Sequence, residues 1–339
     1  MAKNLFKNKT ILITGGTGSF GKAMVRHVWN LGFKEIRIFS RDELKQENMR
    51  IELGNPRVKF HIGDVRDRDS VDAAMAGVDM VFHAAALKQV PSCEFFPMQA
   101  VMTNIVGSHN VIESAVQNGV SRVVCLGTDK AVYPINAMGT TKALMEKAAL
   151  AIARALPAGR TVVSCVRYGN VMSSRGSVIP LFIGQIRAGK PITITDPRMT
   201  RFLLPLSQAI GLVVFALEHA EQGDILIRKA PAATIADLAA AIKQLFKSNV
   251  PVKTIGIRHG EKLHETLATR EELSRAVDMG DFFRVRMDSR SLDYAKYFSE
   301  GNRHEGEIED YTSANTVRLD VAGAKKLLLS TEEVRAELR

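Results

Sequence analysis

Three reactive side chains stand side by side in the middle of the chain, at Thr128-Asp129-Lys130. An apolar run, residues 122–126, precedes them and is typical of a buried strand. After a proline-containing loop, a helix pattern opens with Met138 and Lys142, which are four residues apart and therefore on one helix face. When an acid stands next to an amine, one of the two can donate a proton to a substrate while the other removes a proton from it. We therefore expect residues 125–142 to form an active site.

A glycine-rich segment near the N-terminus indicates where a dinucleotide binds. An apolar strand pattern, residues 9–14, leads into a glycine-rich turn and then a helix pattern, and a second strand pattern follows at residues 35–40. Such glycines permit a tight turn and a close approach to a pyrophosphate, while the helix start offers free N–H groups to the phosphates. The predicted cofactor contacts in this turn are Gly15, Thr17, Gly18, Ser19, Phe20 and Gly21.

The residues after the second strand bear on which dinucleotide binds. An acid here would accept a hydrogen bond from the ribose 2′-hydroxyl of NAD, whereas an arginine would pair with the 2′-phosphate of NADP. The chain has Ser40, Arg41 and Asp42 at this point, with Lys45 close behind. The sequence therefore favours NADP, although Asp42 leaves NAD open.

Later strand ends supply further candidate cofactor contacts. Asp64 ends the third strand pattern, where it would accept from the adenine amino group or else cap the next helix. Small residues follow the fourth strand and allow a backbone to approach a flat cofactor. With Lys142 from the helix after residue 136, the predicted contacts are Asp64, Val65, Ala84, Ala85, Ala86, Lys142 and Tyr168.

Polar side chains in loops are candidates for holding a second, anionic ligand. Three arginines stand in loop settings, and each could hold a diphosphate with two hydrogen bonds. Lys88 would reach a phosphate or sugar, or else remain an ordinary solvated lysine. The histidines show no metal-ligand spacing, so we predict no metal. The residues predicted to bind substrate are Lys88, Asn170, Ser174, Arg175, Thr195, Arg201, Arg258 and Glu261.

Alternating strand and helix patterns predict an α/β fold of the Rossmann type, with a doubly wound parallel sheet and a smaller C-terminal α/β unit. We expect a dinucleotide-binding domain at residues 1–170 and a substrate-binding domain with a polar tail at 171–339. Segments near 200–230 are expected to return to the first domain. A long helix is predicted at about 97–118, and a basic and aromatic turn at 199–202.

Composition narrows the function classes. The 339 residues carry a net charge of +10, but no Lys/Arg-rich block or aromatic-interleaved basic stripe indicates nucleic-acid binding. No apolar run approaches the ~18–20 residues of a membrane helix, and no secretory signal precedes the first strand. The sequence thus predicts a cytoplasmic protein without a membrane partner. Three cysteines, Cys93, Cys125 and Cys165, lack metal or disulfide spacing.

The motifs together resemble the extended short-chain dehydrogenase/reductases that act on nucleotide sugars. More closely, the chain resembles the inverting UDP-N-acetylglucosamine 4,6-dehydratases of bacterial capsule and O-antigen biosynthesis. The resemblance runs nearly end to end, and it implies NADP, a UDP-sugar substrate and a homo-oligomer, often a hexamer. Its motifs are the glycine turn, Phe39-Ser40-Arg41-Asp42-Glu43, His83 to Pro91, Thr128-Asp129-Lys130, Arg167 to Val171, Met199 to Phe202 and Arg258 to Lys262.

The side chains allow a reaction to be written. Oxidation of the sugar C4 hydroxyl acidifies the C5 proton, after which a base removes that proton, an acid protonates the C6 hydroxyl and water leaves. We expect Lys130 to be the base and Asp129 the acid, with Thr128 hydrogen-bonded to the C4 oxygen. To act as a base Lys130 must be neutral, so we expect burial to lower its pKa.

One position departs from the wider superfamily, whose oxidation base is the tyrosine of Tyr-x-x-x-Lys. Here Met138 takes the tyrosine's place, and a thioether cannot accept the proton in this way. The resulting Met-x-x-x-Lys resembles the dehydratase/5-epimerase branch of the L-fucosamine precursor pathway. Lys142 should bind the nicotinamide ribose, and the base is left open among Lys130, Asp129, Tyr133 and a water held by Lys142. The alternatives to the dehydratase are a UDP-hexose 4-epimerase and a catalytically silent NADP-binding protein.

Overall fold

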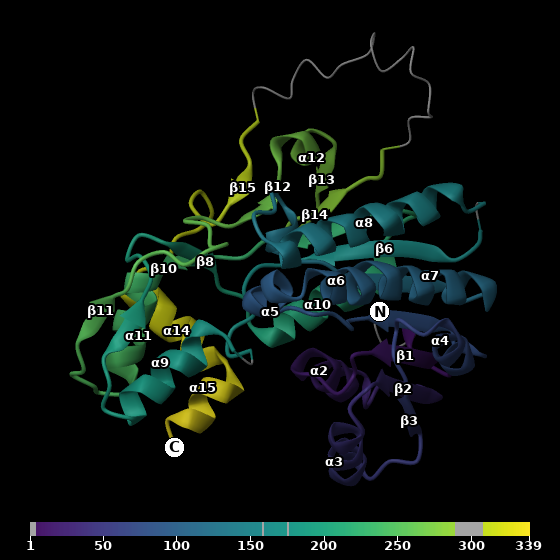
Figure 1. Cartoon of the computed structure of the whole chain (residues 1–339), viewed down its shortest axis with the longest axis horizontal. Helices are drawn as coiled ribbons and strands as arrows, with labels where there is room; N and C mark the ends of the chain where they lie inside the picture. The colour runs from purple at the N-terminus through teal and green to yellow at the C-terminus, as the bar shows by residue number, and fades with distance from the viewer. Residues whose placement is uncertain (1–4, 158, 175, 289–307) are drawn as a thin grey trace.

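A nine-stranded sheet lies at the centre of the molecule, as the computed structural model shows for the residues it describes, 5–157, 159–174, 176–288 and 308–339 (Figure 1). The strand order is β13-β14-β9-β6-β5-β4-β1-β2-β3, parallel throughout except for β14 and β13. The strands are β1 (Thr10–Thr14), β2 (Glu35–Ser40), β3 (Val58–Ile62), β4 (Met80–His83), β5 (Arg122–Leu126), β6 (Val162–Arg167), β9 (Ile225–Arg228), β13 (Ala276–Asp278) and β14 (Phe282–Val285).

Helices cover both faces of this sheet, and their apolar faces supply its two cores. Because strands covered on both sides must be apolar throughout, β1 and β4 read as unbroken buried runs. The predicted Rossmann-type architecture is therefore confirmed. One face carries α2 (Ser19–Val28), α3 (Glu43–Leu53) and α10 (Leu206–His219), and the other carries α4 (Arg68–Met75), α7 (Gly107–Gln117) and α8 (Ala137–Ala155).

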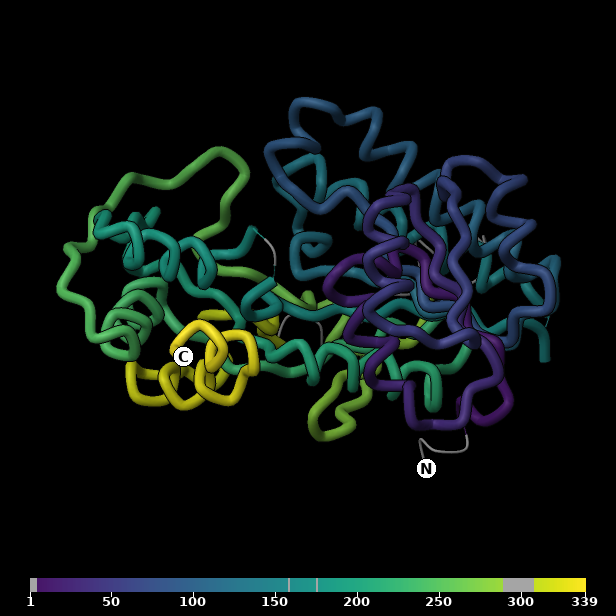
Figure 2. The backbone as a smooth tube through the Cα atoms, turned by 90° about the horizontal axis from the view of Figure 1, so that it is seen from below, coloured from purple at the N-terminus to yellow at the C-terminus, as the bar shows by residue number. Residues whose placement is uncertain are grey.

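A smaller unit has its own apolar core, to which Phe182, Leu238 and Leu328 contribute. Figure 2 shows its C-terminal helices beside the green and teal segments, away from the purple N-terminal elements. Its elements are α9 (Val178–Arg187), β7 (Ile192–Ile194), α11 (Ile235–Leu245), β11 (Val252–Thr254), α14 (Val321–Ser330) and α15 (Glu332–Glu337). Short elements between the two units are β8 (Thr200–Phe202), β10 (Ala232–Thr234), β12 (Thr266–Ala268), α12 (Arg270–Ser274) and β15 (Tyr311–Thr312).

One local prediction was wrong: residues 199–202 are not a turn, because Thr200–Phe202 pairs with β10 as strand β8. The long helix expected at about 97–118 is confirmed and follows the short α5 (Val90–Phe95). It runs through α6 (Pro97–Ala100), a π-helical turn (Val101–Val106) and α7 without a break. The π turn places Asn104 in the core, where its amide bonds both backbone groups of Leu87 and donates to the Thr141 hydroxyl.

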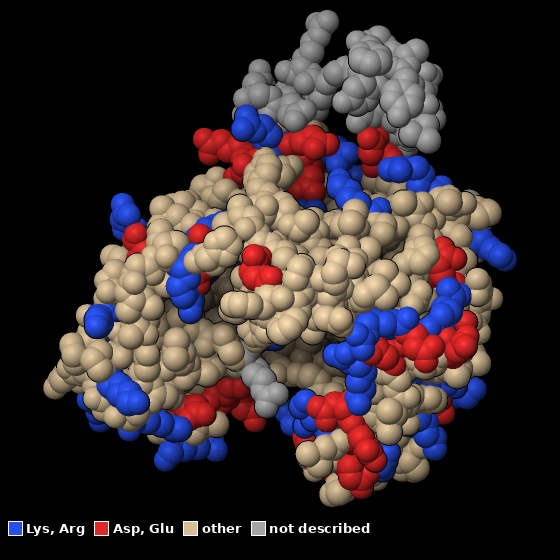
Figure 3. All heavy atoms as spheres, in the orientation of Figure 1, with Lys and Arg blue, Asp and Glu red and all other residues tan. Residues whose placement is uncertain are grey.

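The chain crosses between the units more than once. Beyond residue 170, α10 packs against the sheet and β9, β14 and β13 extend it. The division of the chain at residue 170 stays a prediction. Within the described ranges, no helix has both the length and the apolar character needed to cross a bilayer. Figure 3 shows the face of the molecule that is seen in Figure 1. Acidic and basic side chains are intermixed on it, and a broad area across its middle carries few charged side chains.

Candidate active site

The turn that carries Thr128, Asp129 and Lys130 follows directly on β5 at the carboxyl edge of the sheet. Asp129 is nearly fully buried, with 2% of its side chain exposed, whereas Lys130 is 24% exposed. The Thr128 hydroxyl donates to Asp129 Oδ1 at 2.9 Å, and Lys130 Nζ donates to the same oxygen at 3.1 Å. The predicted hydroxyl, acid and amine therefore meet where parallel sheets bind their ligands.

A second carboxylate, Glu265, completes this group and was missed by sequence reasoning. Its Oε1 lies 3.4 Å from Lys130 Nζ and 3.6 Å from Arg201 Nε, and only 3% of its side chain is exposed. Glu265 ends the run Glu261-Lys262-Leu263-His264-Glu265, in which four of the five residues are polar or charged. Its neighbours in this run are half-buried, and no local signal marks Glu265 as the acid that is fully buried.

The charges of this cluster correct the prediction of a neutral Lys130. Burial by itself would lower the pKa of Lys130, but the carboxylates of Asp129 and Glu265 outweigh it, so the pKa is raised and the amine is held as an ammonium. Burial, together with the charge of Glu265, raises the pKa of Asp129. Burial opposes ionisation of Glu265 as well, yet Lys130 and Arg201 keep its pKa below the ordinary value.

Two carboxylate oxygens of the cluster, Asp129 Oδ2 and Glu265 Oε2, are buried without a hydrogen-bond partner among the residues that the structure describes. Buried polar atoms in proteins are nearly always hydrogen-bonded. A carboxylate whose second oxygen is unsatisfied is suited to accept from, or when protonated to donate to, a polar group of a ligand. The arrangement can thus exchange protons with a bound molecule.

Helix α8 carries the two residues predicted one turn apart, Met138 and Lys142. Met138 is buried against Cys93 and Ala100, so its thioether has an apolar packing role. Lys142 is 6% exposed, and its Nζ lies 3.9 Å from Met145 Sδ. Burial lowers the pKa of Lys142, in contrast to that of Lys130.

Tyr133, one of the residues left open as oxidation base, lies on the loop before α8 with φ +46°. Its hydroxyl donates to Asp310 Oδ1 at 3.3 Å. Burial and the adjacent Asp310 carboxylate raise the pKa of Tyr133, so that a smaller fraction of its hydroxyl is ionised at neutral pH. This geometry does not favour Tyr133 as the base.

A buried ion-pair network fixes α8 against the sheet. Arg167, at the end of β6, pairs with Glu146 of α8 at 2.7 Å and with Glu272 of α12 at 2.8 Å. Burial would lower the pKa of Arg167, but the two carboxylates raise it further above its ordinary value. The helix that presents Lys142 is therefore anchored by charge as well as by packing.

The glycine turn has the geometry that a dinucleotide needs. Gly18 stands at the N-cap of α2, no side chain caps the helix, and Gly18 and Ser19 are exposed, so the first N–H groups are open to phosphates. Gly15 has φ +65°, and a Cβ there would lie 2.9 Å from Ala85 N. A methyl group on Gly21 would collide with the backbone of Gly16.

Side chains around this turn are placed as follows. Phe20 stacks on Tyr168 with ring centroids 5.6 Å apart, and the Thr17 hydroxyl donates to Ser40 at 3.3 Å. The alanines predicted after β4, Ala84 to Ala86, are half-buried, and Val65 is buried against Gly107. The predicted cofactor residues of β1, β2, β4 and α2 are thus grouped at one edge of the sheet.

A polar brace beneath the glycine turn is built around His83, which is 1% exposed. Its Nδ1 lies 2.7 Å from the Thr14 hydroxyl and its Nε2 lies 2.8 Å from the Ser108 hydroxyl. Because Ser108 donates its own hydrogen to the Asn104 carbonyl, we assign the proton of the ring to Nε2. Burial depresses the pKa of His83 to about 3, so the ring is neutral.

The residues that bear on dinucleotide choice lie at the ends of β2 and β3. Arg41 is 53% exposed and lies 3.5 Å from Asp64 Oδ2. Asp42 caps α3 by accepting from Lys45 N, and the Lys45 ammonium pairs with it. Asp64 does not cap α4, a role taken by Asp67. Its carboxylate accepts from Arg66 instead, so its predicted contact with adenine stays a prediction.

One of the predicted substrate residues, Arg201, borders the buried cluster, because it faces Glu265. Its guanidinium and the Thr195 hydroxyl both reach the sulfur of Met199, at 2.8 and 3.3 Å. The side-chain oxygen of Asn170 is buried without a hydrogen-bond partner among the described residues. For all three, a role in substrate binding stays a prediction.

Arg258 and Glu261 form an ion pair with each other at the surface, where Arg258 is 65% exposed. Their turn is docked on the start of α8, because Asn136 Nδ2 donates to the Gly260 carbonyl at 2.9 Å. The structure therefore gives these two residues a partner within the protein, and a role in substrate binding stays a prediction.

The remaining predicted residues lie on two adjacent loops. Lys88 is exposed, and Ser174 is half-buried in the loop before α9. Gly176 of that loop lies against Gln89, so the two loops touch. Arg175 lies outside the described residues.

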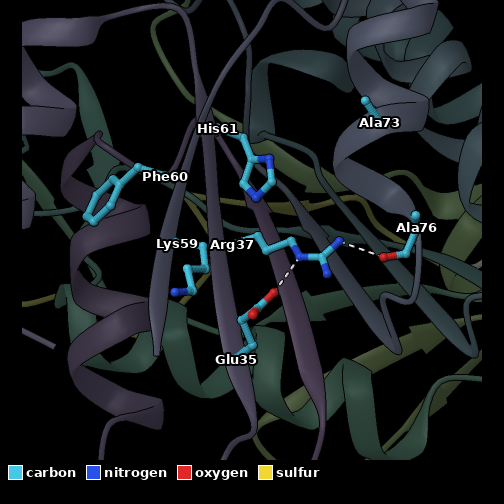
Figure 4. A pocket seen from close by; sticks show the side chains of 7 residues that line it. All are labelled: Glu35, Arg37, Lys59, Phe60, His61, Ala73 and Ala76. Atoms are coloured by element: carbon cyan, nitrogen blue, oxygen red, sulfur yellow. Dashed lines mark hydrogen bonds and ion pairs between the residues drawn. The ribbon is translucent and has the colours of Figure 1, made fainter. Parts of the chain in front are cut away.

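One pocket lies away from all these residues. It has a volume of about 490 Å³ and opens between β2, β3 and α4 (Figure 4). Its arginine, Arg37, is already engaged by Glu35 and by the carbonyl of Ala76, both at 2.6 Å. None of the residues predicted to act lines it. Across the described residues, no group of three or more potential ligands forms a metal site.

Comparisons with known proteins agree with this arrangement of the sheet. A UDP-glucose 4-epimerase of Rickettsia conorii is 56% identical over 99% of both chains. The X-ray structure of Pen from Bacillus thuringiensis covers 96% of this chain and 100% of its own, at 35% identity and a TM-score of 0.87. DesIV, a dTDP-glucose 4,6-dehydratase of Streptomyces venezuelae solved with NAD, shares the fold at 22% identity and a TM-score of 0.68 over 75% of this chain and 86% of its own.

Two family models together span nearly the whole sequence. One, described as polysaccharide biosynthesis protein, matches residues 11–287, and the other, described as the C-terminal part of such proteins, matches residues 288–335. With the end-to-end relative and the shared sheet, the chain belongs to the polysaccharide biosynthesis protein family and has the extended short-chain dehydrogenase/reductase fold.

Proposed function

We propose that the protein is a UDP-N-acetylglucosamine 4,6-dehydratase that inverts C5. Its product would be a UDP-2-acetamido-2,6-dideoxy-hexos-4-ulose, a precursor for a surface polysaccharide. The observation that carries this proposal is the buried group of Asp129, Lys130 and Glu265, with two carboxylate oxygens left for a ligand. Moving a proton at C5 and expelling water from C6 requires such an acid–base group, whereas epimerisation at C4 does not.

The raised pKa of Asp129 supports its role as the acid that protonates the C6 hydroxyl. The ammonium of Lys130 must first give up a proton before it can accept one from C5. Glu265 Oε1, 3.4 Å from Lys130 Nζ, can take that proton, which leaves a neutral amine beside a neutral acid. Substrate binding would favour this transfer, because it excludes water from the site and separated charges are less stable without water.

The dinucleotide fits the glycine turn, whose N–H groups and close backbone approach suit a pyrophosphate. When bound, it supplies a nicotinamide that takes a hydride from C4 and returns one at C6. Lys142 would hold the nicotinamide ribose. Arg41 at the end of β2 supports NADP, while the NAD in the related Streptomyces dehydratase keeps NAD as the alternative. We also expect a homo-oligomer, as the resemblance implies.

A second candidate is a UDP-hexose 4-epimerase. It is favoured by the relatives named UDP-glucose 4-epimerase, which are aligned end to end at 56% identity. Met138 does not separate the two candidates, because both reactions begin with the same oxidation at C4 and a thioether cannot serve as the base for it. The acid–base group of Asp129, Lys130 and Glu265 is the feature that favours the dehydratase.

Product analysis in heavy water separates the two reactions. The purified protein with NADP or NAD is incubated with UDP-N-acetylglucosamine and, separately, with UDP-glucose, and the products are identified by NMR. The proposal expects a 4-keto-6-deoxy sugar with deuterium at C5. C4 epimers without label at C5 would establish the epimerase instead. Tight cofactor binding without turnover of either sugar would favour the silent binding protein.

A further inference from the structure

The buried acid Glu265 has contacts that differ from those of the surface ion pairs of this chain. Its Oε1 is shared by Lys130 Nζ at 3.4 Å and Arg201 Nε at 3.6 Å, so one carboxylate faces two cations. Its other oxygen, Oε2, has no hydrogen-bond partner in the described part of the chain. Because so little of Glu265 is exposed, water does not screen these interactions as it would at the surface.

The backbone around Glu265 is fixed from two sides. Glu265 N donates to Ser313 Oγ at 2.9 Å, and Ser313 N donates to the Glu265 carbonyl at 2.8 Å. The Ser313 hydroxyl also lies 2.6 Å from that of Thr200 in β8, the strand that carries Arg201. Glu265 is therefore held in register with Arg201 and opposite the turn of Lys130.

We propose that Glu265 is a positioning residue that holds the Lys130 ammonium in place and sets its proton affinity. Through Lys130 it also influences how protons are distributed between Lys130 and Asp129. The effect on catalysis rests on the function proposed above, but the effect on proton affinity does not. The reaction written from the sequence uses only the acid and the amine of the turn at 128–130. It therefore gave no reason to look for a further acid such as Glu265.

The charges that face Lys130 decide the direction of the effect. Asp129 lies on its own turn, Glu265 and Lys262 come from the segment before β12, and Arg201 comes from β8. Tyr168, after β6, faces Asp129 rather than Lys130. Only the two carboxylates favour the ammonium, whereas burial and the neighbouring cations oppose it. Removal of the Glu265 charge should therefore lower the proton affinity of Lys130.

The variant Glu265→Gln removes the charge and keeps the shape of the side chain. Lysine side chains are labelled with ¹³C at Cε, and the Lys130 signal is assigned by its loss in Lys130→Arg. Titration of the free protein should show the pKa of Lys130 falling by about 1–3 units in Glu265→Gln, the size expected for loss of an adjacent opposite charge. Glu265→Asp should restore part of the shift.

Glu271→Gln is the matched control, because Glu271 is 57% exposed and pairs only across the surface with Arg275. It should leave the Lys130 titration unchanged. An unchanged Lys130 pKa in a folded Glu265→Gln protein would overturn the proposal, whatever the reaction is. Circular dichroism and cofactor binding report whether the variant is folded.

Activity is read second and separately. If the wild-type protein places solvent deuterium at C5, the limb of its pH–rate profile that reports Lys130 should move to lower pH in Glu265→Gln and partly return in Glu265→Asp. A wild-type protein that exchanges nothing at C5 would remove the proposed function and leave the titration result standing. Loss of rate in Glu265→Gln with no movement of the limb would show that Glu265 serves only as the acceptor of the Lys130 proton or as a structural residue, and would contradict the proposal.

Discussion

Lys130 shows how burial and charge compete at one residue. Burial disfavours an ammonium, and this led to the prediction of a neutral amine. The structure places two carboxylate oxygens within 3.4 Å of the nitrogen, and at such distances in a water-poor site attraction between opposite charges is strong. Among the described residues no carboxylate forms an ion pair with Lys142, and burial outweighs the more distant charge of Glu146, so its pKa is lowered. The pKa values of the two lysines are therefore shifted in opposite directions, upward for Lys130 and downward for Lys142.

Replacement of Lys130 by alanine should stop C5 chemistry. General acid–base groups contribute about 100- to 10,000-fold to rates, so deuterium incorporation at C5 should fall by at least about 100-fold. Binding of NADP and UDP, measured by calorimetry, should change little, because Lys130 is predicted to act on the hexose. The exposed Lys147→Ala on α8 is the control. Near-normal exchange in Lys130→Ala would place the base elsewhere.

Arg41 is the residue on which the preference for NADP depends. In Arg41→Ala the 2′-phosphate would lose a charge-assisted contact worth about 1.5–3 kcal/mol. NADP affinity should then fall by about 10- to 100-fold, while NAD affinity should be nearly unchanged. Fluorescence titration with each dinucleotide measures both. Equal losses for NADP and NAD would show that Arg41 does not read the 2′-phosphate.

At the scale of elements, strands with unbroken apolar character were predictable from the sequence, and with them the parallel sheet and its ligand-binding edge. The glycine turn was predictable because its glycines are required by close backbone contacts, which leaves a recognisable spacing in the sequence. At Gly15, for example, a Cβ would collide with the backbone of Ala85. The π turn at 101–106 was not, because its pattern is that of a helix and only the buried Asn104 distinguishes it. Glu265 was not predictable, because its burial depends on contacts with distant segments at 130, 201 and 313.

The His83 brace joins three elements, β1, β4 and α7, and should make the fold sensitive to acid. The pKa of His83 is about 3 in the folded chain, against 6.5 when unfolded. Its contribution to stability is therefore complete above about pH 6.5 and is lost as the pH falls toward 3, by about 1.4 kcal/mol per pH unit.

Replacement of His83 by glutamine should remove this dependence, because glutamine can keep hydrogen bonds but does not titrate. Urea unfolding of the wild type and of His83→Gln between pH 7 and 5 should show a steeper loss of unfolding free energy in the wild type. The exposed His109 can be replaced by glutamine as the control. Parallel curves for wild type and His83→Gln would show that His83 is protonated in the folded chain as well.

At the scale of the whole molecule, the candidate site draws on both parts of the chain. Lys130 comes from the large sheet, while Arg201 and Glu265 come from segments beyond residue 170 that connect to the smaller unit. The whole sequence carries a net charge of +10. On the face drawn in Figure 3, acidic and basic side chains are intermixed. Small anions such as a dinucleotide and a diphosphate are therefore the expected ligands.

Ligand binding should stabilise the whole chain. A ligand that binds only the folded protein adds about 2.7 kcal/mol at 100 times its Kd. UDP and NADP should each raise the midpoint of thermal unfolding, and their effects should add or exceed the sum if both occupy the same active site. Adenosine at equal concentration is the control for nonspecific effects. Absence of a shift with UDP would argue against a uridine nucleotide as part of the substrate.

The pairing of Glu265 with Ser313 has a consequence for how the protein is made. A nascent chain acquires Thr128, Asp129 and Lys130 together with the strands from β1 to β5. The serine that fixes the second carboxylate, Ser313, is translated more than 180 residues later. A polypeptide released by a premature stop codon just before residue 311 would thus carry the whole reactive turn and still lack the contact that completes it.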